Sequence, residues 1–258
     1  MSILTTRRFT AVGLDELIAE ASLLTRIDRK YLLAETEASA LLTALDPRTR
    51  VLTIEGRTRF RYASTYFDTD ALISYHQAAY GRRRRFKVRT RDYLDAGTAF
   101  LEVKVRGNRD ITVKDRIEHD PAAGAHLTPD ERRFVRDTLD ACRLNGSLTD
   151  DLHPALSTRY TRITLLPPED DTRITLDTGL TWDDGIGELT LPGVVIIETK
   201  SGLRPSAIDR LLWQAGHRPQ SLSKYATGTA ALRRDMPANK WARVIRRHFP
   251  ADELAHAA

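Results

Sequence analysis

The sequence has almost no cysteine and no long apolar segment. Its 258 residues include one cysteine, Cys142, so an internal disulfide cannot form and the cysteine clusters of structural zinc sites are absent. No segment approaches the roughly 20 consecutive apolar residues of a membrane-spanning helix, and the first residues lack the apolar stretch of a secretory signal. We therefore expect a cytoplasmic protein in which Cys142 is a core residue.

Several catalytic and nucleic-acid-binding signatures are also missing. The sequence has no Gly-x-Ser-x-Gly elbow, no phosphate-binding P-loop and no Gly-x-Gly-x-x-Gly fingerprint. Its seven histidines are scattered without the spacing of metal ligands. Aromatic residues make up only 7% and do not interleave with the basic segments, so a base-stacking surface and a nucleic-acid partner are not expected.

The chain instead combines a foldable composition with a positive charge. With 41% hydrophobic and 29% charged residues, it has enough apolar material for a core. Lysine and arginine number 40 against 35 acidic residues, which gives a formal charge of +5. Seven of the basic residues are lysines, and all but Lys240 lie in or beside segments of alternating polarity. The lysines are thus concentrated in candidate strands.

Most of the chain has the period of β-strands. Alternating segments lie at 26–33, 61–68, 85–93, 99–106, 110–118, 155–166, 172–178, 180–183 and 193–200. Helical spacing is confined to 13–24, 36–45, 129–144, 205–215 and the C-terminal part, and Thr128 opens a capping box before the third of these. Because the strands lack regular intervening helices, a large antiparallel barrel or curved sheet is favoured over a parallel sheet. The predicted fold class is α+β.

Charge alternates with apolar residues in these strands. Lys87, Arg89 and Arg91 share one face of a strand whose other face is apolar. In a single strand, this pattern is typical of an ordinary sheet with one wet face. Repeated in six or seven strands, it predicts that charged faces line the inside of a barrel and bind a polyanion. The other charged faces carry Arg26, Asp28, Lys30; Glu102, Lys104, Arg106; Lys114, Arg116; Tyr160, Arg162; Arg173, Asp177; Glu198 and Lys200.

Carboxylates share these cationic faces. Asp28, Glu102, Asp177 and Glu198 could bind Mg²⁺ or Mn²⁺ that bridges phosphate oxygens. Salt bridges to the neighbouring cations are the competing explanation.

The order of eight motifs resembles a known family. RIDRKY, STYFDT, KVRTR, LEVKVR, YTRITL, RITLDT, IIETK and SKY follow one another as in the VTC domain of polyphosphate polymerases, within the CYTH-like triphosphate tunnel metalloenzymes. The resemblance covers about 26–234, leaving 235–258 as a helical tail of a single domain, 1–258. It implies an antiparallel eight-stranded β tunnel barrel with flanking and terminal helices. It also implies Mn²⁺ or Mg²⁺ as cofactor and ATP, polyphosphate or another triphosphate as ligand.

The resemblance also assigns roles to residues. It implies transfer of the γ-phosphate of ATP to a growing polyphosphate chain, with Lys224, Lys200, Arg89 and Arg91 as the catalytic residues. Glu198 corresponds to the metal ligand, and Glu102, Asp177 and Asp28 are further candidates. The implied substrate-binding set is Lys30, Lys87, Arg89, Arg91, Lys104, Lys114, Arg162, Arg173, Lys200 and Lys224.

Two departures from the family pattern affect the predicted activity. Hydrolytic relatives carry Glu-x-Glu-x-Lys on the first strand, whereas this chain has Arg26, Asp28 and Lys30, which favours a polymerase. The family often has a basic residue after the Tyr75-His76 pair, where this chain has Gln77 to Ala79. The run Arg82 to Arg85 is interpreted as a solvated rim that could replace that contact.

Other functions stay open at this point. A triphosphatase of the same fold would release orthophosphate, and a non-catalytic polyphosphate-binding module would bind without turnover. If the activity is coupled to a membrane, a separate membrane partner protein is needed. The basic C-terminal segment around Trp241 and Phe249 is interpreted as a capping helix rather than a membrane-binding one.

Overall fold

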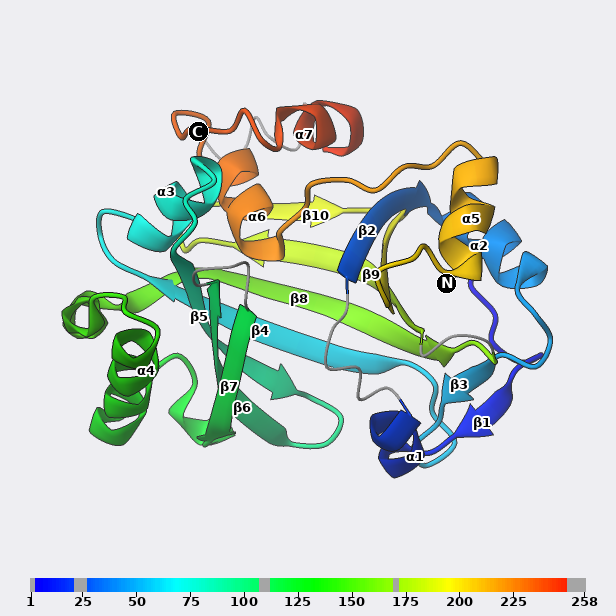
Figure 1. The fold of residues 1–258 in the computed structure, drawn as a ribbon, viewed down its shortest axis with the longest axis horizontal. Helices are drawn as coiled ribbons and strands as arrows, with labels where there is room; N and C mark the ends of the chain where they lie inside the picture. Colours follow the sequence, from blue (N-terminus) through cyan, green and yellow to red (C-terminus); the bar gives the residue numbers. More distant parts are fainter. Residues whose placement is uncertain (1–2, 21–26, 107–111, 169–171, 250–258) are drawn as a thin grey trace. The chain divides into compact units, whose positions relative to one another are not determined.

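The computed structural model describes residues 3–20, 27–106, 112–168 and 172–249 (Figure 1). The chain divides into two compact units, which are described separately. The first unit comprises Met1–Phe60, Tyr160–Leu180 and Leu191–Ser221. The second unit comprises Arg61–Arg159, Thr181–Thr190 and Leu222–Ala258.

The first unit contains the N-terminal helices and strands, together with strands from the later part of the sequence that pair with them. Its elements are β1 (Thr10–Val12), α1 (Leu14–Glu20), β2 (Ile27–Ala34), α2 (Glu35–Ala44), β3 (Arg50–Leu52), β11 (Val194–Ser201), α5 (Ala207–Gln214) and most of β9 (Arg173–Asp183). The long strand β8 (His153–Leu166) belongs to it from Tyr160 onwards. β1 pairs with β3 in parallel, and β2, β11 and β9 pair antiparallel.

The second unit is built around four consecutive strands of the sheet. Its elements are β4 (Phe60–Asp68), α3 (Ile73–Ala79), β5 (Arg85–Tyr93), β6 (Thr98–Arg106), β7 (Thr112–His119), α4 (Pro129–Ala141), β10 (Glu188–Leu191), α6 (Lys224–Leu232) and α7 (Ala242–His248). Short 3₁₀ turns lie at Pro121–Ala123 and Gly146–Asp151. β4, β5, β6 and β7 pair antiparallel.

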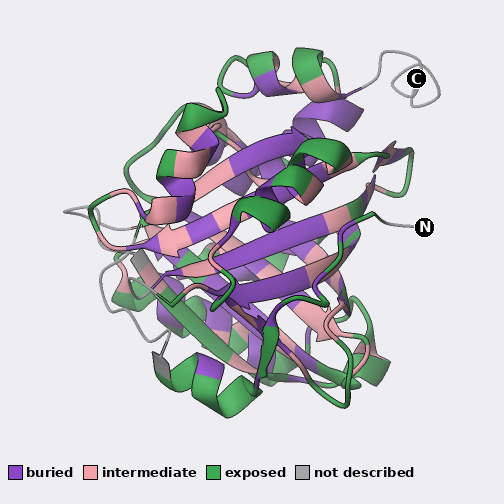
Figure 2. Ribbon diagram, turned by 90° about the vertical axis from the view of Figure 1, so that its right-hand side faces the viewer, coloured by how far each residue is buried: buried purple, intermediate pink, exposed green. Residues whose placement is uncertain are grey.

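The sheet order confirms the predicted fold class. The sheet has eleven strands, and eight of them follow the hydrogen-bonded order β2-β11-β9-β8-β4-β5-β6-β7, with β1, β3 and β10 paired beside this path. The strands β2, β11 and β9 pair antiparallel, as do β4, β5, β6 and β7, and helices flank the sheet, so the α+β prediction is correct. Figure 2 shows buried residues concentrated along the strands and exposed residues on the helices.

Helix α4 covers the apolar face of the second unit's strands. Phe86, Val88, Leu101, Val103 and Val105 form a cluster with Val135 and Leu139 of this helix. Its predicted capping box is present, since the Thr128 side chain accepts from the Glu131 amide and the Glu131 side chain accepts from the Thr128 amide. Cys142 packs against the same cluster at the helix end, as predicted. Each fully buried leucine or valine contributes roughly 1.5–3 kcal/mol relative to exposure.

Helices α2 and α5 cover the apolar face of the first unit's strands. Leu41 and Leu42 of α2 and Ile208 and Leu212 of α5 pack in one cluster with Tyr31. The fully buried carboxylate of Asp209 fixes α5, because it accepts hydrogen bonds from Tyr31 Oη and Thr199 Oγ1, both at 2.7 Å. The charged side chains of these strands therefore lie on the opposite face.

Some boundaries differ from the sequence predictions. The strands expected at 172–178 and 180–183 are one strand, β9, which continues through Gly179 because glycine can adopt the positive φ of 59° found there. Within the described residues, the helix expected over 13–24 spans Leu14–Glu20. Its last predicted residues, like Arg26 and Ile111 of the predicted strands, lie outside the described residues. Helix α3 was not predicted.

The C-terminal segment packs as a cap within the second unit. Trp241, Val244 and Phe249 are buried, while Arg243 and Arg246 are exposed. Trp241 contacts Tyr75 with ring centroids 5.7 Å apart. This confirms the capping interpretation of the segment. Within the described residues, no helix has both the length and the apolar character needed to cross a membrane.

Candidate functional site

In the second unit, β5, β6 and β7 present a cationic face opposite α4. The antiparallel registers place Lys87 beside Lys104 and Lys104 beside Lys114. In the next rows, Arg89 lies opposite Glu102, and Arg91 lies opposite Phe100. We call this group the second-unit cluster; its predicted members are Lys87, Arg89, Arg91, Glu102, Lys104 and Lys114. Because they belong to three neighbouring strands and one face, the predicted residues of this part of the chain do lie together.

Glu102 is the anionic centre of the second-unit cluster. Its side chain is 3% exposed, and Oε2 accepts from Arg89 Nη2 at 2.5 Å and from Nε at 2.8 Å. Lys114 Nζ lies 3.2 Å from Oε1, and Arg91 Nη1 lies 3.9 Å from it. Burial alone would raise the pKa of Glu102, but the charges of Arg89, Arg91 and Lys114 outweigh it and lower the pKa well below its usual range. The carboxylate is therefore ionised and surrounded by cations.

Two polar residues of β4 extend the cluster and were not predicted. Tyr66 lies opposite Arg89, and its hydroxyl accepts from Arg89 Nη1 at 3.0 Å. Ser64 lies opposite Arg91 and is 1% exposed. Ser64 Oγ and Arg91 Nε are buried and make no hydrogen bond with any described residue. Buried polar atoms are nearly always hydrogen-bonded, so this group can accommodate a polar ligand. The alternation of β4 was the only available sequence signal.

The SKY motif lies at the start of α6. Ser223 caps the helix by accepting from the Ala226 amide, and its hydroxyl also receives a hydrogen bond from Lys87 Nζ at 2.7 Å. The backbone carbonyl of Lys224 accepts from Trp182 Nε1 at 2.8 Å. The structure therefore brings the Lys224 backbone next to the lysine end of the second-unit cluster.

The STYFDT and SKY motifs meet through a buried hydrogen bond. Tyr225 Oη donates to Asp68 Oδ2 at 2.5 Å, and its ring stacks on Tyr66 at 5.3 Å. Asp68 is fully buried and also accepts from the amides of Ser74 and Tyr75 at the start of α3. Burial, followed by the charge of Asp68, raises the pKa of Tyr225. These residues hold α6 and α3 against β4.

In the first unit, the charged face is a chain of ion pairs. Glu198 lies opposite Lys30, and Lys200 lies opposite Asp28. Lys30 Nζ is 3.2 Å from Glu198 Oε2, Lys200 donates to Glu198 Oε1, and Lys200 Nζ is 3.2 Å from Asp28 Oδ1. We call this group the first-unit cluster; its members are Asp28, Lys30, Glu198 and Lys200, together with Arg162, Arg173, Thr175 and Asp177. Its acids and cations alternate along the face.

A bidentate pair continues the first-unit cluster. Arg162 donates to Asp177 from Nε at 2.6 Å and from Nη2 at 2.8 Å, and Asp177 is 1% exposed. Arg173 lies opposite Lys200 on β11. Thr175, opposite Glu198, is 3% exposed, and its hydroxyl makes no hydrogen bond with any described residue. The face therefore presents a hydroxyl beside its charged groups.

The carboxylates fit a metal ion that is held largely by its substrate. No group of three or more histidine, cysteine, aspartate or glutamate residues within the described ranges could form a metal cage. Glu198 and Asp28 converge on the same lysine, whereas Arg162 and Arg89 respectively bind Asp177 and Glu102. Mg²⁺ is typically bound by one or two carboxylates together with waters and substrate phosphates. Glu198 and Asp28 satisfy that requirement.

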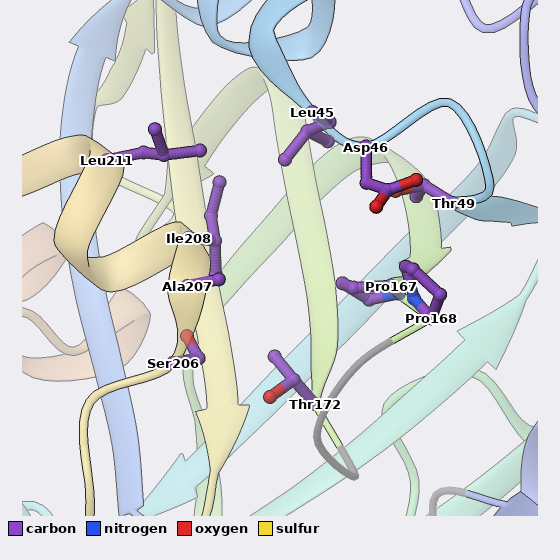
Figure 3. Close-up of a pocket in the computed structure, with 10 residues that line it drawn as sticks. All are labelled: Leu45, Asp46, Thr49, Pro167, Pro168, Thr172, Ser206, Ala207, Ile208 and Leu211. Carbon is purple, nitrogen blue, oxygen red and sulfur yellow. The ribbon is translucent and has the colours of Figure 1, made fainter.

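A small cavity of the first unit lies apart from these residues. Its volume is about 50 Å³, and Figure 3 shows Leu45, Ile208 and Leu211 among the side chains that line it. None of the predicted site residues lines this cavity. The charged faces, rather than this cavity, therefore carry the candidate site.

The Arg82 to Arg85 run lies at the start of β5. Arg82, Arg83 and Arg84 are exposed, and Arg85 is half-buried. The exposure of the first three agrees with the interpretation of a solvated rim.

A family model described as the VTC domain matches residues 25–233. A candidate adenylyl cyclase from Hippeastrum, described as having a dominant triphosphatase activity, shares 19% identity with a TM-score of 0.51. That match covers 80% of this chain and 96% of the other, and it shows a shared fold.

A candidate adenylate cyclase from Bacillus halodurans has 14% identity and a TM-score of 0.47, with 77% of this chain and 94% of the other covered. No curated protein sequence matches. The family model spans most of the chain and includes every predicted site residue. The chain belongs to the VTC domain family.

Proposed function

We propose that the protein is a polyphosphate polymerase that transfers the γ-phosphate of ATP to a growing polyphosphate chain with a divalent metal ion. The second-unit cluster is the observation that supports this most strongly. Neighbouring strands there place like charges opposite one another, which is destabilising in a sheet. A bound polyanion removes that repulsion, and the buried polar atoms of Ser64 and Arg91 supply hydrogen-bond partners for it.

The chain's residues would position and stabilise the phosphates. Phosphoryl transfer requires mainly alignment and charge stabilisation, so no protein nucleophile is needed. Guanidinium groups bind phosphate in bidentate fashion, and lysines act as point charges. In this proposal the arginines are Arg89, Arg91, Arg162 and Arg173, and the lysines are Lys30, Lys87, Lys104, Lys114, Lys200 and Lys224. The Ser64 hydroxyl would donate a hydrogen bond to a phosphate oxygen beside Arg91.

Glu198 and Asp28 would hold the Mn²⁺ or Mg²⁺ ion in this proposal. When bound, the ion would neutralise the negative charge that develops on the phosphate oxygens during transfer. Lys200 bridges the two carboxylates and would keep them oriented. Glu102 would orient Arg89, and Asp177 would orient Arg162, rather than bind the metal ion.

A triphosphatase is the second candidate, because the Hippeastrum protein of the same fold is described as having that activity. Against it, Asp28 is the one carboxylate of the described β2 residues, and Lys200 binds it. A hydrolase would need a group that activates water, and a lysine-bound aspartate is poorly suited to that role. A non-catalytic binding module would use the same cations without turnover.

Product analysis tests the proposal. Purified protein is incubated with γ-labelled ATP and Mn²⁺, with and without a short polyphosphate primer, and the products are separated on a gel. A ladder that is lost in Glu198→Ala and Lys224→Ala but kept in Arg133→Ala, a change at an exposed residue of α4, supports a polymerase. Orthophosphate alone would replace the proposal with the triphosphatase. Binding without turnover in any metal would replace it with the binding module.

A further inference from the structure

The backbone of Lys224 is held by a tryptophan that the proposed mechanism does not use. Trp182 of β9 donates from Nε1 to the Lys224 carbonyl oxygen at 2.8 Å. The Trp182 side chain is fully buried, and a buried indole N–H needs a partner within the protein. Lys224 is the first residue of α6, so its carbonyl also belongs to the first turn of that helix. Trp182 therefore fixes the point from which the Lys224 side chain leaves the helix.

This contact depends on a glycine one turn further along α6. Gly228 lies four residues after Lys224, so the two residues share one side of the helix. A methyl group added at Gly228 would lie 2.6 Å from Nε1 and 2.8 Å from Cγ of Trp182, which is closer than packed atoms approach. Glycine is unfavourable inside a helix. The close approach of the indole ring accounts for its presence at this position.

Further contacts attach Trp182 and α6 to the rest of the second unit. Phe249 lies behind the indole, with ring centroids 5.5 Å apart, and is 4% exposed. At the other end of α6, Arg233 Nε donates to Asp184 Oδ2 at 2.9 Å, and Asp184 follows Trp182 by two residues. The segment around the end of β9 thus holds α6 at both ends. Loss of the Trp182 contact would displace mainly the first turn of α6, because the other end stays attached.

The first turn of α6 lies at the lysine end of the second-unit cluster. Ser223, the residue before Lys224, accepts a hydrogen bond from Lys87 Nζ at 2.7 Å. A lysine is a point charge on a flexible stem, so its contribution to anion binding depends on where the backbone places it. We propose that Trp182 is a positioning residue that raises the affinity of this site for phosphates through Lys224, without touching them. This inference rests on the proposed function.

A double-mutant cycle on tripolyphosphate binding, without metal or ATP, tests the role of Trp182. Trp182→Phe keeps an aromatic ring but removes the N–H donor, and we expect it to weaken binding by about fivefold. In a Lys224→Ala background the same change should weaken binding by less than about twofold, because the positioned charge is already absent. Gly228→Ala, which displaces the indole from the side of α6, should reproduce both results.

Two matched controls separate this effect from a general response to substitution. Gly13→Ala adds a methyl group where no atom lies within 4 Å. Trp213→Phe removes an indole N–H that donates to Tyr31 Oη at 3.1 Å in the first unit. Both variants should bind tripolyphosphate with the affinity of the parent protein.

The cycle distinguishes failure of this inference from failure of the proposed function. Equal losses in the parent and Lys224→Ala backgrounds would show a purely structural role and overturn the positioning role, as would unchanged affinity in both Trp182→Phe and Gly228→Ala. A parent protein that does not bind tripolyphosphate would overturn the proposed function and the positioning role together. Thermal melting identifies any misfolded variant. Phe249→Leu, which only loosens the packing behind the indole, is a third and milder variant that should show the same pattern at a smaller size.

Discussion

The charged faces of the two units differ in how their cations are balanced. In the first unit, Asp28, Glu198 and Asp177 are each in contact with a lysine or arginine, so acids and cations alternate. In the second unit, Glu102 is the one buried carboxylate on the described face of β5, β6 and β7, and Arg89, Arg91 and Lys114 all surround it.

The difference separates two tasks that a phosphotransferase needs. A face with unbalanced cations gains stability from a bound polyanion, whereas a balanced face with accessible carboxylates can hold a metal ion. We therefore expect anion affinity to depend mainly on the second unit and metal dependence mainly on the first. The following variants test that division, beginning with the largest expected effect.

Glu198→Gln should lower the proposed polymerase activity by about 100-fold or more, because it removes the carboxylate proposed as the principal metal ligand. Initial rates over a Mn²⁺ titration measure the effect. Asp46→Asn, a change at a carboxylate outside both clusters, is the control. Full activity of Glu198→Gln at ordinary Mn²⁺ concentrations would show that the balanced face does not bind the metal.

Glu102→Gln should destabilise the protein by about 3 kcal/mol, because it leaves the half-buried guanidinium groups of Arg89 and Arg91 without their counter-charge. Denaturant unfolding with and without polyphosphate measures the loss, and polyphosphate should restore much of it by supplying the missing negative charge. Glu118→Gln, at an exposed glutamate on the same face, should change little. Since the pKa of Glu102 is lowered, its contribution is present above the unfolded-state pKa and is lost as pH falls through the folded-state pKa. Destabilisation that polyphosphate does not relieve would contradict the anion-binding role.

Ser64→Ala should weaken tripolyphosphate binding by about tenfold, because it removes the buried hydroxyl beside Arg91 that is proposed to contact a phosphate. Calorimetric titration measures the affinity, with Thr65→Ala, the next residue of β4, as the matched control. If both variants bind as the parent protein does, Ser64 lies outside the anion site.

His119→Gln should have the smallest effect, about 1 kcal/mol, and should not change anion binding. His119 contacts Glu131 through Nδ1 at 2.5 Å and the Gly124 carbonyl through Nε2 at 3.0 Å. Burial lowers the pKa of His119, but these two contacts outweigh it and raise the pKa. The contribution is therefore complete below the unfolded-state pKa and is lost as pH rises through the folded-state pKa.

Unfolding of the parent protein and of His119→Gln at several pH values measures this. The free energies of unfolding of the two proteins should differ at pH 5.5 and converge above pH 9. A constant difference across that range would refute the buried ion pair.

The sequence predicts which side chains share one face of a strand, but not which side chains of neighbouring strands they contact. A period of two determines which side chains share a face, so Lys87, Arg89 and Arg91 were placed together correctly. Cross-strand neighbours depend on register, which the period does not give. The contacts of Glu102 with Arg89 and of Asp177 with Arg162 could therefore not be predicted from the period alone.

Other features had too weak a local signal. Helix α3 was missed because its first turn is fixed by the buried Asp68, and Leu72 before it has a φ of 48°, which is unusual for leucine. Tyr66 and Ser64 were missed because hydroxyl groups do not stand out in a half-buried strand.

The most direct test of the division between the two faces is tripolyphosphate binding to Arg91→Gln and Glu198→Gln, each measured with and without Mn²⁺. The account predicts that Arg91→Gln loses affinity by about tenfold or more in both conditions. It predicts that Glu198→Gln keeps the metal-free affinity and loses only the increase that Mn²⁺ produces. Undiminished metal-free binding by Arg91→Gln, or its loss in Glu198→Gln, would contradict the account.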